Sequence, residues 1–222
     1  MQGVGADSSI VLKSDLFGRI ERVRPDRGPP IVRRDLRHSP WWLRQVARGL
    51  AAREARALAR LEGMAQVPRL HAWDGMILVR SWIEGEPMQV ARPTDPAFWL
   101  AALRLLARLH RRGIAHNDLA KEPNWLVTSH GLPAILDFQL ATIHRRRTSL
   151  FRLLAREDLR HLLKHKRTYC PQRLTLRQKA ILATPSVAAR LLRRFGKPVY
   201  VLVTRRLLRW RDDEGRGGRF AR

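Results

Sequence analysis

The stretch from His116 to Val127 has the sequence His-Asn-Asp-Leu-Ala-Lys-Glu-Pro-Asn-Trp-Leu-Val, and the triplet Asp137-Phe138-Gln139 begins thirteen residues after Asn124. Between these two motifs, the apolar runs 125–127 and 133–136 flank a polar turn, which predicts a short β-hairpin. A strongly apolar segment precedes the first motif. The polar residues of both motifs are therefore expected at the ends of a hairpin, next to a buried helix.

Two carboxylates and one amide stand out in these motifs: Asp118, Asn124 and Asp137. Oxygen donors of this kind suit Mg²⁺, which binds a few protein groups together with phosphate oxygens and water. Each residue alone could equally cap a turn or end a strand. In this order and in this context, the three together favour a site for a divalent cation.

The rest of the chain divides into two parts of different composition. Apolar or alternating runs predict strands at 9–12, 20–23, 31–32, 69–73 and 76–82, with turns at Gly18 and at Asp74-Gly75. A helical repeat over 41–62 lies among these runs. After residues 84–87 the pattern is mainly helical, from Thr94-Asp95-Pro96 to Gly113, at 149–166 and at 175–195. The sequence thus predicts an α+β protein with a β-rich first part.

Glu54 interrupts the apolar side of the predicted 41–62 helix, because it lies four residues from both Leu50 and Leu58. A carboxylate in that position is costly unless a cation meets it, either across an interface or from a neighbouring Arg. At the start of the same helix, Trp41 and Trp42 are expected to pack into the core as an N-terminal staple. The alternative for this pair is an anchor at a membrane interface.

The charge balance is unusual, with 44 Lys and Arg against 19 Asp and Glu and a formal net charge of +25. Such a charge attracts nucleic acid, anionic lipid headgroups or phosphorylated ligands, although an Arg-rich solvated surface explains it equally well. The single Cys170 excludes a disulfide within the chain and favours a reducing compartment. No apolar run reaches the ~18 residues of a membrane span. We therefore expect a cytoplasmic protein without a transmembrane segment, with peripheral contact at the inner membrane as the alternative.

The two motifs resemble those of the protein-kinase-like superfamily. His116-Asn117-Asp118 is similar to the His-Arg-Asp catalytic loop, and Asp137-Phe138-Gln139 is similar to Asp-Phe-Gly. No Ala-Pro-Glu motif follows Asp137 at the usual distance, which is typical of compact branches. Residues 9–165 most resemble two such branches, the RIO-type serine/threonine kinases and the lipopolysaccharide-core sugar kinases.

The resemblance implies a two-lobed protein-kinase-like fold with a β-rich N-lobe and a compact helical C-lobe. We expect the N-lobe over residues 1–83, the hinge at 84–87 and the C-lobe with the catalytic loop over 88–211. Residues 212–222 are expected to form a mobile tail.

The resemblance also implies catalytic roles. Asp118 would accept or orient the proton of the substrate hydroxyl, and Lys121 would neutralise charge on the phosphoryl group in transfer. Asn124 and Asp137 would hold Mg²⁺ between the phosphates of ATP.

Further residues are implied in ATP binding. Glu54 matches the helix-C Glu that orients a phosphate-gripping cation, and Arg34 stands where kinases usually have Lys. Lys13 on the first strand could supply that ammonium group instead. Gly18 lies in the loop that covers the phosphates, and Glu84 lies in the hinge that receives adenine through backbone groups.

Four positions depart from the kinase pattern. Arg34 replaces the usual Lys, the phosphate-covering loop has a single glycine, Asn124 follows Asp118 by one residue more than usual, and Gln139 replaces Gly. Arg is permanently charged and bulkier than Lys, so the two are not equivalent. A nucleotide-binding pseudokinase, or a nucleic-acid-binding scaffold that uses the positive charge, is therefore the alternative outside the enzymes.

The sequence favours an ATP- and Mg²⁺-dependent phosphotransferase that moves the γ-phosphoryl group to a hydroxyl acceptor. A serine/threonine protein kinase is the first hypothesis, and a kinase of lipopolysaccharide-core sugars is the second. The basic surface suits a ribonucleoprotein or an anionic glycolipid equally, so the charge does not separate them.

Overall fold

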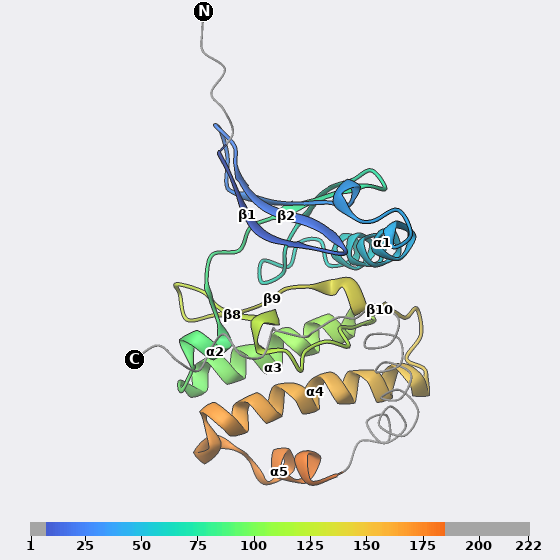
Figure 1. The fold of residues 1–222 in the computed structure, drawn as a ribbon. Helices are drawn as coiled ribbons and strands as arrows, with labels where there is room; N and C mark the ends of the chain where they lie inside the picture. The colour runs from blue at the N-terminus through green and yellow to red at the C-terminus, as the bar shows by residue number, and fades with distance from the viewer. Residues whose placement is uncertain (1–7, 185–222) are drawn as a thin grey trace, which may run out of the picture. The chain divides into compact units, whose positions relative to one another are not determined.

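A computed structural model describes residues 8–184 of the chain. Its first part is a five-stranded antiparallel sheet (Figure 1) with the spatial order β1-β2-β3-β5-β4. The strands are β1 (Ser8–Asp15), β2 (Gly18–Arg24), β3 (Ile31–Asp35), β4 (Leu70–Trp73) and β5 (Ile77–Ser81). The hairpins predicted at Gly18 and at Asp74-Gly75 are confirmed.

Gly18 has two structural reasons to be glycine. Its φ of +113° lies in the region that side chains with a Cβ disfavour, and a Cβ here would come within 2.6 Å of the Asp35 carbonyl oxygen. The close approach brings the β1–β2 turn onto the end of β3. The backbone thus accounts for this glycine without a ligand.

One helix packs on the first part of the fold. After a 3-10 turn at Leu36–His38 (η1), α1 runs from Arg44 to Arg60. Ala47 and Ala51 of α1 are buried with Leu36, against Phe17, Trp73 and Met76. The predicted helix is confirmed, although residues 41–43 form a turn and not its first helical residues.

The staple predicted for Trp41 and Trp42 is wrong. The two side chains are 81% and 51% exposed, and it is Leu43, the next residue, that is buried. An apolar pair before a helix favours packing against the core. One apolar residue is enough to pack this turn against the core, and Leu43 takes that place.

The chain crosses from the five-stranded sheet to a second sheet between Ser81 and Glu86. The second sheet contains β6 (Glu86–Pro87), β8 (Trp125–Val127) and β9 (Pro133–Ile135). A Cβ on Gly85 would come within 2.8 Å of the Val127 carbonyl oxygen, so the crossing segment lies directly against the β8–β9 hairpin.

The second part is mainly helical, as predicted. It contains α2 (Met88–Ala91), α3 (Pro96–Arg111), α4 (Ser149–Tyr169) and α5 (Leu176–Ala183). The Asp95 side chain caps α3 and Pro96 is its first residue, as the sequence indicated. The remainder of the helix predicted to residue 195, and the residues beyond it, lie outside the described residues.

The hydrophobic core of the second part surrounds α3. Trp99, Leu105 and Leu106 of α3 are buried together with Trp125 of β8 and with Phe138. Two short strands, β7 (Ile114–Ala115) and β10 (Thr142–Ile143), pair beside this core. None of the helices within residues 8–184 is long and apolar enough to cross a bilayer.

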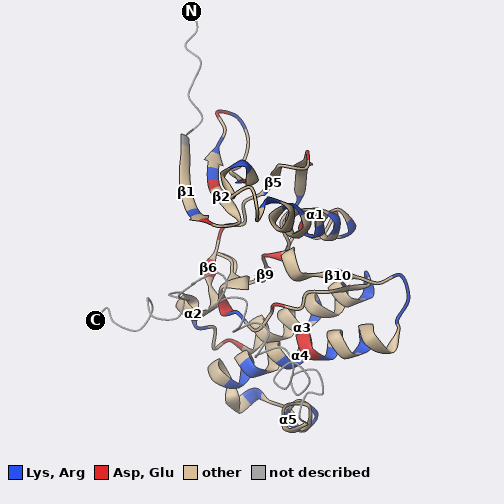
Figure 2. Ribbon diagram, turned by 45° about the vertical axis from the view of Figure 1, so that its right-hand side comes forward, with Lys and Arg blue, Asp and Glu red and all other residues tan. Residues whose placement is uncertain are grey.

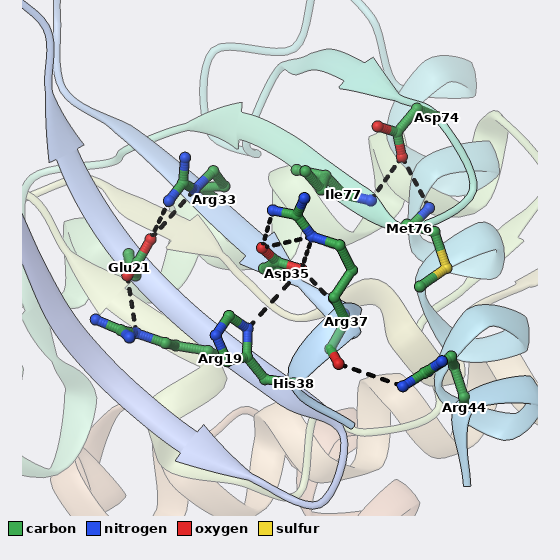
Figure 3. A network of polar contacts seen from close by, with 10 residues as sticks. All are labelled: Arg19, Glu21, Arg33, Asp35, Arg37, His38, Arg44, Asp74, Met76 and Ile77. Atoms are coloured by element: carbon green, nitrogen blue, oxygen red, sulfur yellow. Dashed lines mark hydrogen bonds and ion pairs between the residues drawn. The ribbon is translucent and has the colours of Figure 1, made fainter. Parts of the chain in front are cut away.

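The sheet also carries buried carboxylates, each surrounded by cations (Figure 3). Glu21 of β2 lies between Arg19, at 2.8 Å, and Arg33, at 2.7 Å. Asp35 accepts hydrogen bonds from the Arg37 side chain, the shortest at 2.5 Å, and from the Arg37 backbone N–H. Pairing with arginine offsets the cost of burying these carboxylates.

This network makes the stability depend on pH through Asp35. The hydrogen bonds from Arg37 outweigh the opposing effect of burial and lower the pKa of Asp35 below its ordinary value of 3.8. A lowered pKa contributes stability above the unfolded pKa, and this stability is lost as pH falls through the folded pKa. We expect wild type to exceed Asp35→Asn in urea midpoint at neutral pH, with the gap closing below about pH 4.

The control for this measurement is Asp26→Asn, because Asp26 is exposed in the β2–β3 loop. Its midpoint should follow wild type at each pH. A gap between wild type and Asp35→Asn that stays constant down to about pH 2 would contradict the linkage.

Candidate active site

Three of the predicted site residues meet in the loop after β7. The Asn124 side-chain amide donates to the Asp118 carbonyl oxygen at 2.9 Å and to Asp118 Oδ2 at 3.1 Å. Lys121 Nζ lies 3.2 Å from the same Oδ2. The Asp118 side chain is only 14% exposed, so its charge is held by an ammonium and an amide in a partly dry environment.

The extra residue between Asp118 and Asn124 does not separate them. Residues Glu122–Asn124 form a 3-10 turn (η2), and the Asn124 N–H donates to the Lys121 carbonyl. The tight turn takes up the additional residue because a 3-10 helix closes a hydrogen bond over three residues.

His116 joins this loop to the segment that carries Asp137. Its ring Nδ1 accepts from the Asp118 N–H at 3.3 Å, and its Nε2 donates to the Leu136 carbonyl at 2.9 Å. Since a carbonyl can only accept, the ring proton lies on Nε2. The Leu136 N–H in turn donates to the Asn124 carbonyl. The backbone just before Asp137 is therefore hydrogen-bonded to both ends of the loop, at His116 and at Asn124.

Asp137 has an unusual backbone, with φ of +61°. Non-glycine residues in this region are uncommon, and they concentrate at functional sites where surrounding contacts hold them. Phe138 supplies such a contact, because it is fully buried with its ring 4.7 Å from the His116 ring. Asn117, with φ of +66°, donates through its side chain to the Leu140 carbonyl and to Thr142 Oγ1.

Gln139 uses one oxygen of Asp137. Its side-chain amide donates to Asp137 Oδ1 at 2.7 Å. This contact exists because Gln139 replaces the usual glycine of the Asp-Phe-Gly motif, and glycine has no side-chain amide. Gln139 therefore competes with any cation for this oxygen.

Glu54 is paired with two arginines and not with one. Its Oε2 lies 3.3 Å from Arg34 Nη1, as the sequence predicted, and its Oε1 lies 3.2 Å from Arg80 Nε on β5. Only 2% of the Glu54 side chain is exposed. In the sheet register Arg34 lies opposite Leu78 and Arg80 lies opposite Val32, so both arginines lie on the sheet face that α1 covers.

Sequence reasoning missed Arg80. The signal was present, because Arg80 interrupts the apolar strand 76–82 as Glu54 interrupts an apolar helix face. Two opposite charges in two apolar elements predict a buried pair, but the pairing partner depends on strand order, which local pattern does not supply.

Helix α4 supports the catalytic loop, and this role was also missed. Asp158 Oδ2 accepts from the His116 N–H at 2.8 Å, and Oδ1 accepts from the Asn117 N–H at 2.9 Å. His165 Nε2 donates to the Leu119 carbonyl, and the Tyr169 hydroxyl donates to Glu122 Oε2 at 2.7 Å. Burial and the hydrogen bond to Glu122 raise the pKa of Tyr169 to about 12.

Asp158, His165 and Tyr169 are spaced by seven and four residues, so they share one face of α4. The sequence signal was a polar stripe where an apolar stripe is usual. Along this face α4 binds the loop from His116 to Glu122.

The remaining predicted residues lie in the first part of the fold or in the crossing segment. Lys13 forms an ion pair with Asp15 at 3.2 Å. It lies opposite Ile20, and Ile20 lies opposite Arg34, so Lys13 and Arg34 share a sheet face two strands apart. The structure gives Gly18 the packing role described above.

Glu84 is exposed, and its Oε2 accepts from Trp82 Nε1 at 2.5 Å and from Arg22 at 3.2 Å. The Arg22 guanidinium also lies 4.5 Å from the Trp82 ring centroid. The Glu84 side chain thus joins the crossing segment to β2. Because the side chain is used in this way, Glu84 would contact a ligand through its backbone groups.

The antiparallel sheet with one helix, the crossing segment and the loop that joins Asp118 to Asp137 define a protein-kinase-like protein. A family model for the RIO domain matches residues 31–182. The chain belongs to this family, whose members are atypical protein-kinase-like, ATP-binding phosphotransferases. The match begins at β3, so the hairpin with Lys13 and Gly18 precedes it.

The donor set near Asp118 fits the divalent metal that RIO-type kinases generally use. Asn124 turns its amide nitrogen toward Asp118, so its Oδ1 would be the atom available to a metal, and Asp137 would add a carboxylate. Carboxylate and amide oxygens are hard donors that suit Mg²⁺. Asn124 and Asp137 would hold the ion, which would supply charge neutralisation to phosphate oxygens.

Proposed function

We propose that this protein transfers the γ-phosphoryl group of ATP to the hydroxyl group of a serine or threonine on a protein. The observation that carries the proposal is the hydrogen bonding of His116, which joins the Asp118 loop to the backbone before Asp137. A phosphotransferase needs a base beside the acceptor hydroxyl and a metal-binding carboxylate on the phosphates, held in fixed relation. These residues have the types and the mutual contacts for those roles.

Each residue has a defined task in this proposal. Asp118 orients the acceptor hydroxyl and takes its proton, and Lys121, 56% exposed and paired with Asp118 at 3.2 Å, neutralises charge on the phosphoryl group in transfer. Arg34 and Arg80 carry two positive charges against the single charge of Glu54. The surplus charge on this sheet face attracts the phosphates of ATP.

We also propose that residues 1–83 act as the N-lobe, 84–87 as the hinge and 88–211 as the C-lobe. The crossing from one sheet to the other between Ser81 and Glu86 supports a hinge there. Gly18 and Lys13 then lie in the N-lobe, where ATP would be covered, and Glu84 lies in the hinge.

The decisive experiment asks where the label goes. The purified chain is incubated with γ-labelled ATP, Mg²⁺ and a cell lysate, and the label is followed into protein, lipid or neither. Label on serine or threonine supports the proposal. Label in lipid would instead indicate a kinase of lipopolysaccharide-core sugars. The absence of label from both would contradict phosphoryl transfer and favour a protein that only binds the nucleotide.

A second candidate is a nucleotide-binding protein that does not transfer phosphate. Arg34 in place of Lys, and the Gln139 amide on Asp137, favour this candidate. The measurement that separates it is a Mg²⁺·ATP thermal shift without turnover. A nucleic-acid-binding scaffold would instead bind RNA with a steep salt dependence and show no response to ATP.

Asp137→Asn tests the metal role directly. Wild type should rise in melting temperature with ATP only when Mg²⁺ is present, because a ligand that binds the folded state alone stabilises it. The variant should lose most of this rise, since a neutral amide is a weaker ligand for Mg²⁺. Asp26→Asn, with the same chemical change at an exposed loop site, should keep the full rise; equal shifts in all three proteins would remove Asp137 from metal binding.

Gln139→Ala should strengthen the response to Mg²⁺. The change frees Asp137 Oδ1 from its hydrogen bond, which contributes about 1.5–3 kcal/mol when the acceptor is charged. The Mg²⁺ concentration at half-maximal thermal shift should therefore fall, by about tenfold or more. Gln45→Ala, at an exposed site on α1, is the control. An unchanged or higher Mg²⁺ requirement in Gln139→Ala would show that Gln139 does not restrain the site.

A further inference from the structure

The start of α1 carries a large exposed apolar surface. Trp41 is 81% exposed, Trp42 is 51% exposed and Val46 is 52% exposed; we call these three residues the Trp patch. Within residues 8–184 neither indole makes a hydrogen bond or a ring contact. A tryptophan buries roughly 150–250 Å² when it is packed, so two adjacent indoles in water are a substantial unsatisfied surface.

The fold does not use the Trp patch. The residues that attach this end of α1 to the core are Leu43, Ala47 and Ala51. Val46 precedes Ala47 by one position in α1, so its side chain is turned by about 100° from that of Ala47, and Trp42 lies in the turn before the helix, next to the buried Leu43. The indoles can therefore serve an external contact without any cost to the packing of α1.

Arginines continue the same side of the helix. Arg53, Arg56 and Arg60 are exposed and follow Trp42, Val46 and Gly49 at steps of three and four residues. Arg56 and Arg60 donate to backbone carbonyls, which are neutral, so their charges are not cancelled. Figure 2 shows Lys and Arg segments, in blue, along α1.

No carboxylate opposes these charges on α1. The only acid of the helix is Glu54, which is buried on the other side against Arg34 and Arg80. The exposed face of α1 thus has an aromatic and apolar end followed by a purely cationic length. The helix itself, from Arg44 to Arg60, extends over about 24 Å.

We propose that this face of α1 docks the protein on a membrane surface of anionic phospholipid. Tryptophan prefers the headgroup level of a bilayer, where its ring is apolar and its N–H meets water. Arginines on a helix that lies along the surface attract anionic headgroups. The Trp patch would insert at one end and the three arginines would fix the helix parallel to the membrane.

A nucleic acid fits the same face less well. Phosphates would pair with the arginines and bases could stack on the indoles, but stacking platforms lie within positively charged grooves. Stacking of bases would also leave the exposed, apolar Val46 without a partner. A membrane interface uses all six side chains.

The first test is flotation of the full chain with vesicles of phosphatidylcholine, alone or mixed with phosphatidylglycerol. Wild type should float only with the anionic vesicles, and brominated lipids should quench its tryptophan fluorescence. Trp41→Ser/Trp42→Ser should bind the anionic vesicles at least about tenfold more weakly, with an unchanged melting temperature because both side chains are exposed. Equal binding by this variant, or the absence of quenching in wild type, would overturn the proposal.

The second test separates this face from the general positive charge. Two triple variants remove the same charge, one from α1 and one from the exposed run before α4: Arg53→Gln/Arg56→Gln/Arg60→Gln and Arg145→Gln/Arg146→Gln/Arg147→Gln. The α1 variant should lose most of its vesicle binding, and the other should keep nearly all of it. Equal losses would show non-specific attraction. A loss of RNA binding with unchanged vesicle binding would assign the face to nucleic acid.

Discussion

Asp118→Asn should lower the rate of phosphoryl transfer by about a hundredfold to ten-thousandfold, which is the usual contribution of a positioned general base. The substitution removes the charge and the proton-accepting oxygen but keeps the shape of the side chain. The Asn124 amide can still donate to the Asp118 backbone carbonyl, so the loop should keep its conformation. The rate is measured by initial velocities of label transfer at saturating ATP.

The loss should fall on the catalytic rate and not on ATP binding. We therefore expect the Mg²⁺·ATP thermal shift of Asp118→Asn to stay close to that of wild type, whereas Asp137→Asn loses it. Asp26→Asn, at an exposed loop position, should transfer phosphate at the wild-type rate. A rate within about threefold of wild type in Asp118→Asn would exclude this residue from the chemical step.

The parts of the fold that sequence predicts are those fixed by local chemistry. Asp74 accepts from the N–H groups of Met76 and Ile77, and this turn is encoded within four residues. Asp95 and Pro96 start α3 in the same local way. The resemblance to RIO-type kinases and the α+β class could also be recognised from the sequence, and both are confirmed.

The parts that sequence does not predict depend on pairing between distant segments. The strands β6, β7 and β10 have two residues each, which is too short to show a period. Arg80 reaches Glu54 only because β5 lies beside β3 in the sheet. The contact of Gln139 with Asp137 depends on the left-handed backbone at Asp137, and the sequence does not predict this conformation.

Trp41 and Trp42 show a different limit. Hydrophobicity predicts that burial of the pair is favourable, but it does not identify the surface that provides the burial. We assigned both to the core of the chain, and the structure places both in solvent. The error is informative, because an apolar pair that the fold leaves exposed indicates a partner outside the chain.

Asp158 has the largest expected effect on stability among the residues around the site. It is 1% exposed and accepts from the backbone N–H groups of His116 and Asn117 and from the His110 ring. Asp158→Ala leaves the buried His116 N–H and two part-buried donors without their acceptor, at about 1–3 kcal/mol for each group that stays unsatisfied. We expect a loss of about 3 kcal/mol or more in unfolding free energy, seen as a lower urea midpoint with an unchanged slope.

Glu157→Ala is the matched control on the same helix, because the contact of Glu157 with Arg160 is long, at 3.8 Å, and its loss should cost less than the loss of the Asp158 hydrogen bonds. Asp158→Asn keeps one acceptor and should fall between wild type and Asp158→Ala, which allows the prediction to be tested even if the alanine variant does not fold. Since His116 and Asn117 precede Asp118, the Asn variant should also transfer phosphate more slowly while its Mg²⁺·ATP shift remains. Unchanged stability in both Asp158 variants would mean that α4 does not hold the catalytic loop, and the positioning of Asp118 would then rest on His116 and Asn124 alone.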